Sequence, residues 1–142
     1  MAFPRQKFRE LVFQLLFSRD FSLKNELETA PVMMALLKTT RGQVKKAEAM
    51  VEEILAQKAF LDEKIRAVSE DYRLERISKA ELNILRLGLF ELFFQTSPSK
   101  VVLAEAIRLA RKFGSENGSD FVNALLDQVY QKNKDGLAAT EK

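Results

Sequence analysis

The fold is decided by residues 84–129, which read ILRLGLFEL (84–92), VVLAEAIRLARKFG (101–114) and SENGSDFVNALLDQV (115–129). Apolar residues recur at threes and fours in each stretch, which is the spacing of helices. A Ser-Pro-Ser turn at 97–99 separates the first two. Gly114 is predicted to end the second helix in a left-handed conformation, and Ser119 to cap the third. Short turns between such helices predict antiparallel neighbours.

Working outward, the remaining chain is also helical in pattern. Ser78 and Glu81 form a capping box that starts the apolar helix running to Phe94. Residues 44–68 predict one long charged helix, residues 29–39 a short one, and residues 5–19 a helix with an apolar face. The sequence therefore predicts an all-α bundle of six or seven helices. We expect one domain over residues 1–134 and a frayed tail over residues 135–142.

Composition excludes several classes of function. The chain has 142 residues, with 46% hydrophobic and 30% charged residues, which are values of a globular protein. It has no cysteine and no histidine, so disulfides, thiol nucleophiles, imidazole catalysis and the usual zinc sites are excluded. No apolar run approaches the ~20 residues of a membrane helix. A cytoplasmic protein without a secretory signal is expected.

Residues that could support catalysis do not converge. Acidic neighbours such as Glu52 and Glu53 point about 100° apart on a helix, and no phosphate-loop or hydrolase motif occurs. We expect neither an enzyme nor a bound metal or cofactor. Three charged residues inside apolar helices are interpreted as internal ion pairs that join helices: Arg86, Glu91 and Glu105.

A basic N-terminal segment is the first binding candidate. The net charge is only +3, but residues 1–21 hold four Lys/Arg against two acids. Arg5, Arg9, Phe13 and Phe17 follow one another at i,i+4 spacing, and cations followed by rings suit single-stranded RNA. The alternative is that both phenylalanines belong to the core and the arginines only solubilise a helix end.

A second candidate is the loop of residues 114–121. Lys112 ends the preceding helix, and free backbone amides at the start of the next helix could take a phosphate. Many turns between helices have the same composition, so this pattern alone does not distinguish a binding loop from a structural one.

Several motifs, in order, resemble the NusB family of bacterial transcription antitermination factors. The family's R-R-x-A-R-E is similar to RQKFRE at 5–10, and Q-x-L-Y to QLLF at 14–17. Its L-R-x-x-x-Y-E-L is similar to LRLGLFEL at 85–92, and P-x-K-V-x-x-N-E-A-x-x-L-A-K-x-F-G to PSKVVLAEAIRLARKFG at 98–114. Its K-F-V-N-G-x-L-D is similar to DFVNALLD at 120–127. The match covers residues 78–131 most fully.

The resemblance implies an RNA-binding adaptor that pairs with the ribosomal protein NusE. The pair would bind boxA RNA and help RNA polymerase resist termination on ribosomal RNA operons. By motif position, RNA contacts would come from Arg5, Lys7, Arg9, Phe17, Lys100, Lys112 and Phe121. The NusE surface would include Glu75 and Glu81. About four cations on phosphates would give a slope of roughly −3 for log affinity against log salt.

Departures from the family pattern indicate a weaker RNA contact. Gln6 replaces an arginine, Phe17 a tyrosine and Ala104 an asparagine; in the loop, Asn117 replaces an acid and Asp120 a base. Asp120 would lie beside the expected phosphate path.

Two other interpretations stay open. One is a helical protein-interaction module with no RNA role, and the other is a relative of the RNA-guiding domains fused to rRNA methyltransferases. The chain may be a monomer or a homodimer, since a bare apolar surface can self-associate.

Overall fold

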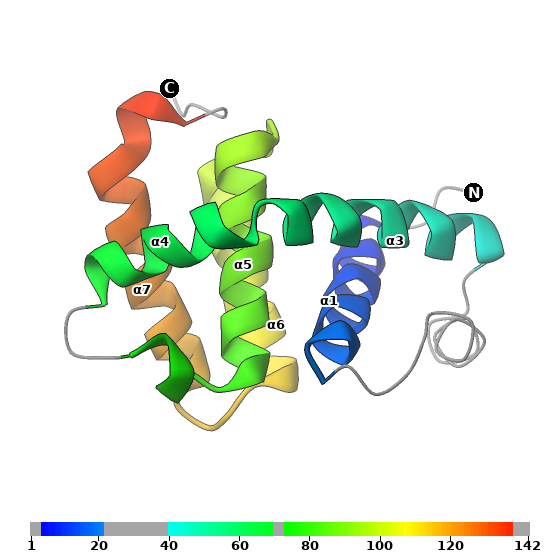
Figure 1. Cartoon of the computed structure of the whole chain (residues 1–142), viewed down its shortest axis with the longest axis horizontal. Helices are drawn as coiled ribbons and strands as arrows, with labels where there is room; N and C mark the ends of the chain where they lie inside the picture. The colour runs from blue at the N-terminus through cyan, green and yellow to red at the C-terminus, as the bar shows by residue number, and fades with distance from the viewer. Residues whose placement is uncertain (1–3, 22–39, 70–72, 138–142) are drawn as a thin grey trace. The chain divides into compact units, whose positions relative to one another are not determined.

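The computed structural model describes residues 4–21, 40–69 and 73–137. Over these residues the chain is entirely helical apart from turns, which confirms the all-α class. The α-helices are α1 (Arg5–Phe21), α3 (Arg41–Ala56), α4 (Lys58–Val68), α5 (Lys79–Phe94), α6 (Ser99–Phe113) and α7 (Gly118–Asn133), with 3₁₀ turns η1 (Leu74–Arg76) and η2 (Lys134–Gly136). Figure 1 shows them in chain order. The helix expected at 29–39 lies outside the described residues.

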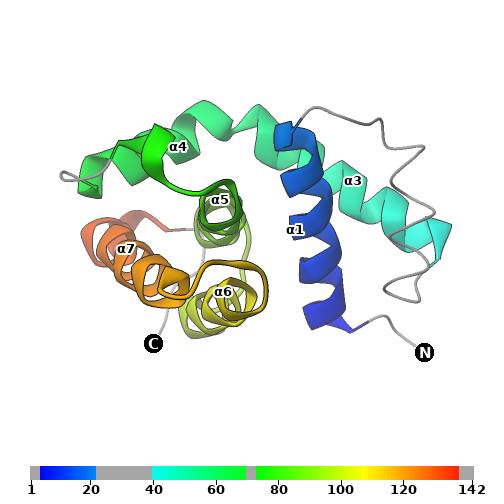
Figure 2. The ribbon, with the colours of Figure 1, turned by 90° about the horizontal axis from the view of Figure 1, so that it is seen from below.

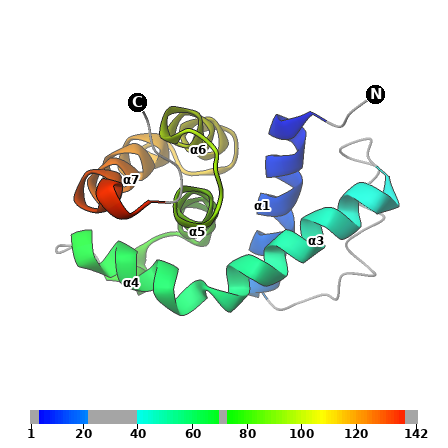
Figure 3. The same ribbon diagram turned by 90° about the horizontal axis from the view of Figure 1, so that it is seen from above.

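The chain forms two compact units, Met1–Ala56 and Gln57–Lys142. The single domain expected over residues 1–134 would include all of the first unit and most of the second. In the first unit, α1 and α3 cross each other (Figure 3). The apolar face predicted for α1 is buried at Leu11, Val12, Leu15 and Leu16. Thr40 accepts a hydrogen bond from the Gln43 backbone N–H at 3.2 Å and so begins α3.

In the second unit, α5, α6 and α7 pack around one another, seen nearly end-on in Figure 2. Helix α5 is buried on almost every side because its sequence is apolar all round. Gly88 makes a close approach possible: a Cβ there would lie 3.2 Å from Leu126 of α7. Helix α4 packs across α5 and α7.

A buried ion pair joins α4 to α5. Arg86 donates to both carboxylate oxygens of Asp62, from Nε at 2.9 Å and from Nη2 at 3.0 Å. Nη1 donates to Asn83 at 3.3 Å. The internal pair expected for Arg86 is therefore confirmed, and the two-pronged geometry is the strong form of this interaction. Glu105 pairs with Arg108 on its own helix at 2.9 Å, and its expected role between helices stays a prediction.

Three local predictions were wrong. The long helix expected over 44–68 is interrupted at Gln57, whose φ of −102° and ψ of 11° depart from helical values. Gly114 is extended (φ −92°, ψ −172°) rather than left-handed. Helix α7 begins at Gly118, so Ser119 lies inside it and is not its cap. The last two differences have one physical reason, which is that the Glu81 carboxylate of α5 lies against Gly114 and Gly118 and accepts the Ser115 backbone N–H.

The frayed tail expected over residues 135–142 lies mostly outside the described residues, which end at Leu137. Residues 134–136 form η2, and Leu137 is buried. In the part of the chain that the structure describes, no helix is long and apolar enough to cross a membrane.

Candidate functional site

The basic segment of α1 presents two of its three cations to solvent. Arg5 and Lys7 are exposed in the first turns, where no acidic residue balances them. Arg9 is only 5% exposed. Arg5 and Lys7 are therefore the cations of this segment that face solvent, and the RNA contact expected of the buried Arg9 stays a prediction.

The aromatic part of the same ridge is mostly internal. Phe13 is buried, as the core interpretation predicted. Phe17 is half-buried and stacks on Phe13, with ring centroids 5.7 Å apart and an interplanar angle of 19°. Arg19, in the last turn of α1, forms an ion pair with Glu52 of α3. Of this ridge, only Phe17 combines an aromatic ring with partial exposure.

Two lysines of α6 are exposed at opposite ends of that helix. Lys100 is in the first turn and Lys112 in the last. Twelve residues at 1.5 Å per residue separate them by about 18 Å along the axis. The Lys112 ammonium lies 5.7 Å from the Phe113 ring centroid, a cation–π contact that steadies it.

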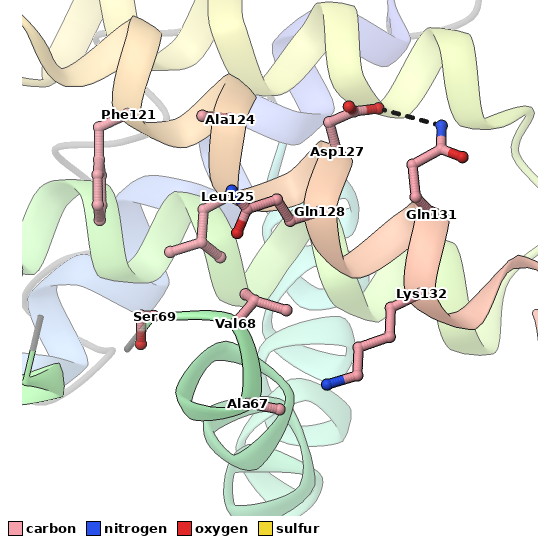
Figure 4. Close-up of a pocket in the computed structure, with 10 residues that line it drawn as sticks. All are labelled: Ala67, Val68, Ser69, Phe121, Ala124, Leu125, Asp127, Gln128, Gln131 and Lys132. Carbon is pink, nitrogen blue, oxygen red and sulfur yellow. Dashed lines mark hydrogen bonds between the residues drawn. The ribbon is translucent and has the colours of Figure 1, made fainter. Parts of the chain in front are cut away.

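A groove of about 770 Å³ runs between the end of α4 and one face of α7 (Figure 4). Its lining includes Val68, Ser69, Phe121, Leu125, Gln128 and Lys132. The Phe121 ring projects from α7 toward the end of α4 and is half-buried. Of the residues expected to bind RNA, Phe121 alone lies in this groove.

The carboxylate of Glu81 organises the loop between α6 and α7. Glu81 is 5% exposed and comes from the first turn of α5, where the Ser78 hydroxyl accepts its backbone N–H at 3.2 Å, confirming the capping pattern. The Ser78 hydroxyl also donates to one carboxylate oxygen. The other oxygen accepts the Ser115 backbone N–H at 2.7 Å. A Cβ on Gly114 or Gly118 would overlap this carboxylate.

The position of the Glu81 carboxylate bears on two expected binding surfaces, the start of α7 and the NusE surface. Glu81 lies against Gly118, the first residue of α7, so a protein carboxylate already lies close to the helix N-terminus where a phosphate was expected. Glu81 is also buried and hydrogen-bonded within the chain, and its expected place in the NusE surface stays a prediction. Glu75, in η1, is exposed.

A partly exposed aromatic cluster lies where α4 packs on α5. Phe60 contacts Phe93 and Phe94 edge-on, with centroids 5.2 and 5.5 Å apart. Phe60 is 38% and Phe94 43% exposed. The Lys64 ammonium lies 5.2 Å from the Phe60 centroid. Within the described residues, no group of three or more acidic side chains could hold a metal ion.

Comparisons with known proteins identify the family. The model of the NusB family matches residues 6–131. The transcription antitermination protein NusB of Pseudothermotoga lettingae is 37% identical over 128 residues, covering 88% of this chain and 89% of the relative. The chain belongs to the NusB family.

Solved structures agree with the fold. NusB of T. maritima superposes with a TM-score of 0.77 at 29% identity, covering 93% of this chain and 94% of that one. A crystal structure of antitermination factors NusB and NusE in complex with dsRNA superposes with a TM-score of 0.73 at 23% identity, covering 90% and 96% of the two chains. At that identity, the second comparison shows the fold alone.

Within this NusB-family chain, sequence reasoning missed two features of the site. One is the Glu81 carboxylate against Gly114 and Gly118, for which the capping pattern was a local signal only. The other is the groove beside Phe121. Its residues on α7 recur at helical spacing, but the opposite wall, at Val68 and Ser69, comes from a distant part of the sequence.

Proposed function

We propose that this chain is a transcription antitermination factor that, with NusE, binds boxA-type single-stranded RNA and promotes processive transcription of ribosomal RNA operons. The observation that carries the proposal is its 37% identity, over 88% of its length, to a relative named transcription antitermination protein NusB. RNA polymerase would be reached indirectly, through the RNA and NusE. The protein acts in the cytoplasm and is not an enzyme.

The RNA contacts divide by chemistry. Arg5, Lys7, Lys100 and Lys112 are exposed cations that would hold phosphates. Phe17 and Phe121 are half-buried rings with surface on which bases would stack. Four neutralised phosphates at about −0.7 each give a salt slope of roughly −3. NusE, a basic partner in this proposal, would meet the surface around Glu75.

The decisive experiment is fluorescence anisotropy of a labelled boxA oligomer and a scrambled oligomer, with and without purified NusE, across salt. A preference for boxA that increases with NusE supports the proposal. Equal and steeply salt-dependent binding of both oligomers would show only a basic surface that binds RNA without sequence preference. Light scattering over a concentration series distinguishes a monomer from a homodimer in the same samples.

A second candidate function is a protein-interaction module without specific RNA binding. The exposed cluster of Phe60, Phe93 and Phe94 favours it, because partly exposed aromatic rings are enriched at protein interfaces. Binding of NusE without retention of either RNA would select this function. A role as an RNA-guiding relative of methyltransferase-fused domains predicts binding to ribosomal RNA fragments that lack boxA.

A further inference from the structure

The groove between α4 and α7 has a lining without net charge, which suits a ring rather than a phosphate. Phe121, Leu125, Gln128 and Lys132 follow one another at helical spacing along one face of α7, over about 16 Å. The lining has one carboxylate, Asp127, and one ammonium, Lys132, so the charges balance. A phosphate would gain little here, because a single cation is offset by the acid on the same helix.

The walls supply the two contacts that an unstacked base requires. Phe121 gives an aromatic face, and Val68 and Leu125 give apolar surface between the helices (Figure 4). The Gln128 side chain turns into the groove in Figure 4, and its exposed amide can both donate and accept a hydrogen bond. Stacking plus edge hydrogen bonds is how single-stranded RNA bases are held.

Ser69, on the opposite wall, adds a second polar group. It is 9% exposed, and its hydroxyl has no hydrogen-bond partner within the described residues. Buried hydroxyls are normally paired, so this one is costly until a partner reaches it. The Ser69 side chain can adopt three staggered χ1 rotamers. In one of them, a polar ligand in the groove can serve as the hydrogen-bond partner of the hydroxyl.

We infer that this groove is a nucleobase subsite, in which one unstacked base of the bound strand lies against Phe121 and is hydrogen-bonded by Gln128 and Ser69. The inference rests on the proposed RNA function and extends it to residues outside the family motif positions. It places the phosphates on the lysines of α6 and the N-terminal cations, and one base at the α4–α7 groove.

Base contacts and phosphate contacts differ in their salt dependence, which gives the test its readout. Gln128→Ala should weaken binding of a boxA oligomer roughly two- to tenfold, the range of a single hydrogen bond, and leave the salt slope unchanged. Ser69→Ala should weaken binding similarly without lowering the unfolding temperature, because it removes an unpaired buried hydroxyl. Asn123→Ala, exposed on α7 and outside the groove lining, is the matched control with no change expected.

An abasic scan of the oligomer locates the base. Removing the base at one position of the oligomer should lower the affinity of the natural chain on the order of tenfold, as expected for a stacked base. The same removal should lower the affinity of Gln128→Ala clearly less, because that variant has already lost a contact to the same base. If the natural chain binds RNA but each abasic oligomer loses the same factor of affinity for Gln128→Ala as for the natural chain, the subsite is overturned and the RNA function is retained. Absence of any RNA binding by the natural chain, with NusE present, would overturn both.

Discussion

Two buried carboxylates of the second unit are stabilised in different ways. Asp62 of α4 faces a guanidinium, with both its oxygens bonded to Arg86 of α5. Glu81 of α5 faces uncharged groups instead. It accepts hydrogen bonds from the Ser78 hydroxyl and the Ser115 backbone N–H, and it lies against Gly118 at the start of α7. The first arrangement joins two helices through opposite charges. The second fixes the backbone of the loop that follows α6, so its loss should also affect Lys112 in the last turn of α6.

The largest effect should follow from breaking the charge pair. Arg86→Met leaves Asp62 buried without its cation, and we expect the free energy of unfolding to fall by about 3–5 kcal/mol. Denaturation by urea, followed by circular dichroism, measures it. Replacing both partners, as Asp62→Leu with Arg86→Met, should recover most of the loss, since the uncompensated charge is gone. A double variant as unstable as the single one would contradict this account of the pair.

Glycine-to-alanine variants sharpen the comparison at the loop. Gly114→Ala places a Cβ against the Glu81 carboxylate and 2.7 Å from the Ala110 carbonyl oxygen. Because that oxygen belongs to the backbone and cannot turn away, we expect destabilisation of about 1–3 kcal/mol in thermal unfolding.

Gly42→Ala is the matched control for this variant. The nearest atom to a Cβ there is the Thr40 hydroxyl at 3.7 Å, and residue 42 lies inside α3. Because Gly42 lies in the first turn, where helix propensity counts for less than in the interior, the same substitution should leave stability unchanged or raise it by up to about 0.5 kcal/mol. A Gly114→Ala variant that is at least as stable as the natural chain would show that the close contacts at residue 114 do not constrain the loop.

Glu81→Gln tests whether charge or shape holds the loop. Glutamine keeps the size and one acceptor but loses the negative charge beside two helix starts, so we expect destabilisation of about 1–2 kcal/mol. If the loop positions Lys112, RNA affinity should also fall, while the double Asp62→Leu, Arg86→Met variant should bind RNA normally. Anisotropy titrations of the two variants under conditions where both are folded compare these regions directly.

The smallest effect concerns the surface of the loop. Asp120 is exposed in the first turn of α7, where the family pattern has a base. Asp120→Lys should tighten RNA binding at low salt and steepen the salt slope by about 0.7, which corresponds to one more phosphate. An unchanged slope would place the RNA path away from this loop, and the Glu81 contact would then be purely structural.

Local patterns predicted much of the fold. The periodicity of residues 84–129 correctly indicates α5, α6 and α7, and Ser78 is the predicted cap, because both features depend on residues within a few positions of each other. Arg86 was correctly assigned to an internal pair, although its partner, 24 residues away, could not be named. Patterning fails at Gly114 and Ser119, where a carboxylate from another helix sets the backbone.

The sequence by itself determined the helical class, the family and the cations available for RNA. Only the tertiary structure decided which of them face solvent, that Glu81 is internal, and that Phe121 shares a groove with Ser69 and Gln128. The physical reason is the distance along the sequence over which the two kinds of interaction act. Helix periodicity and capping arise from neighbours in the chain, whereas burial and side-chain contacts between helices depend on which surfaces the fold brings together.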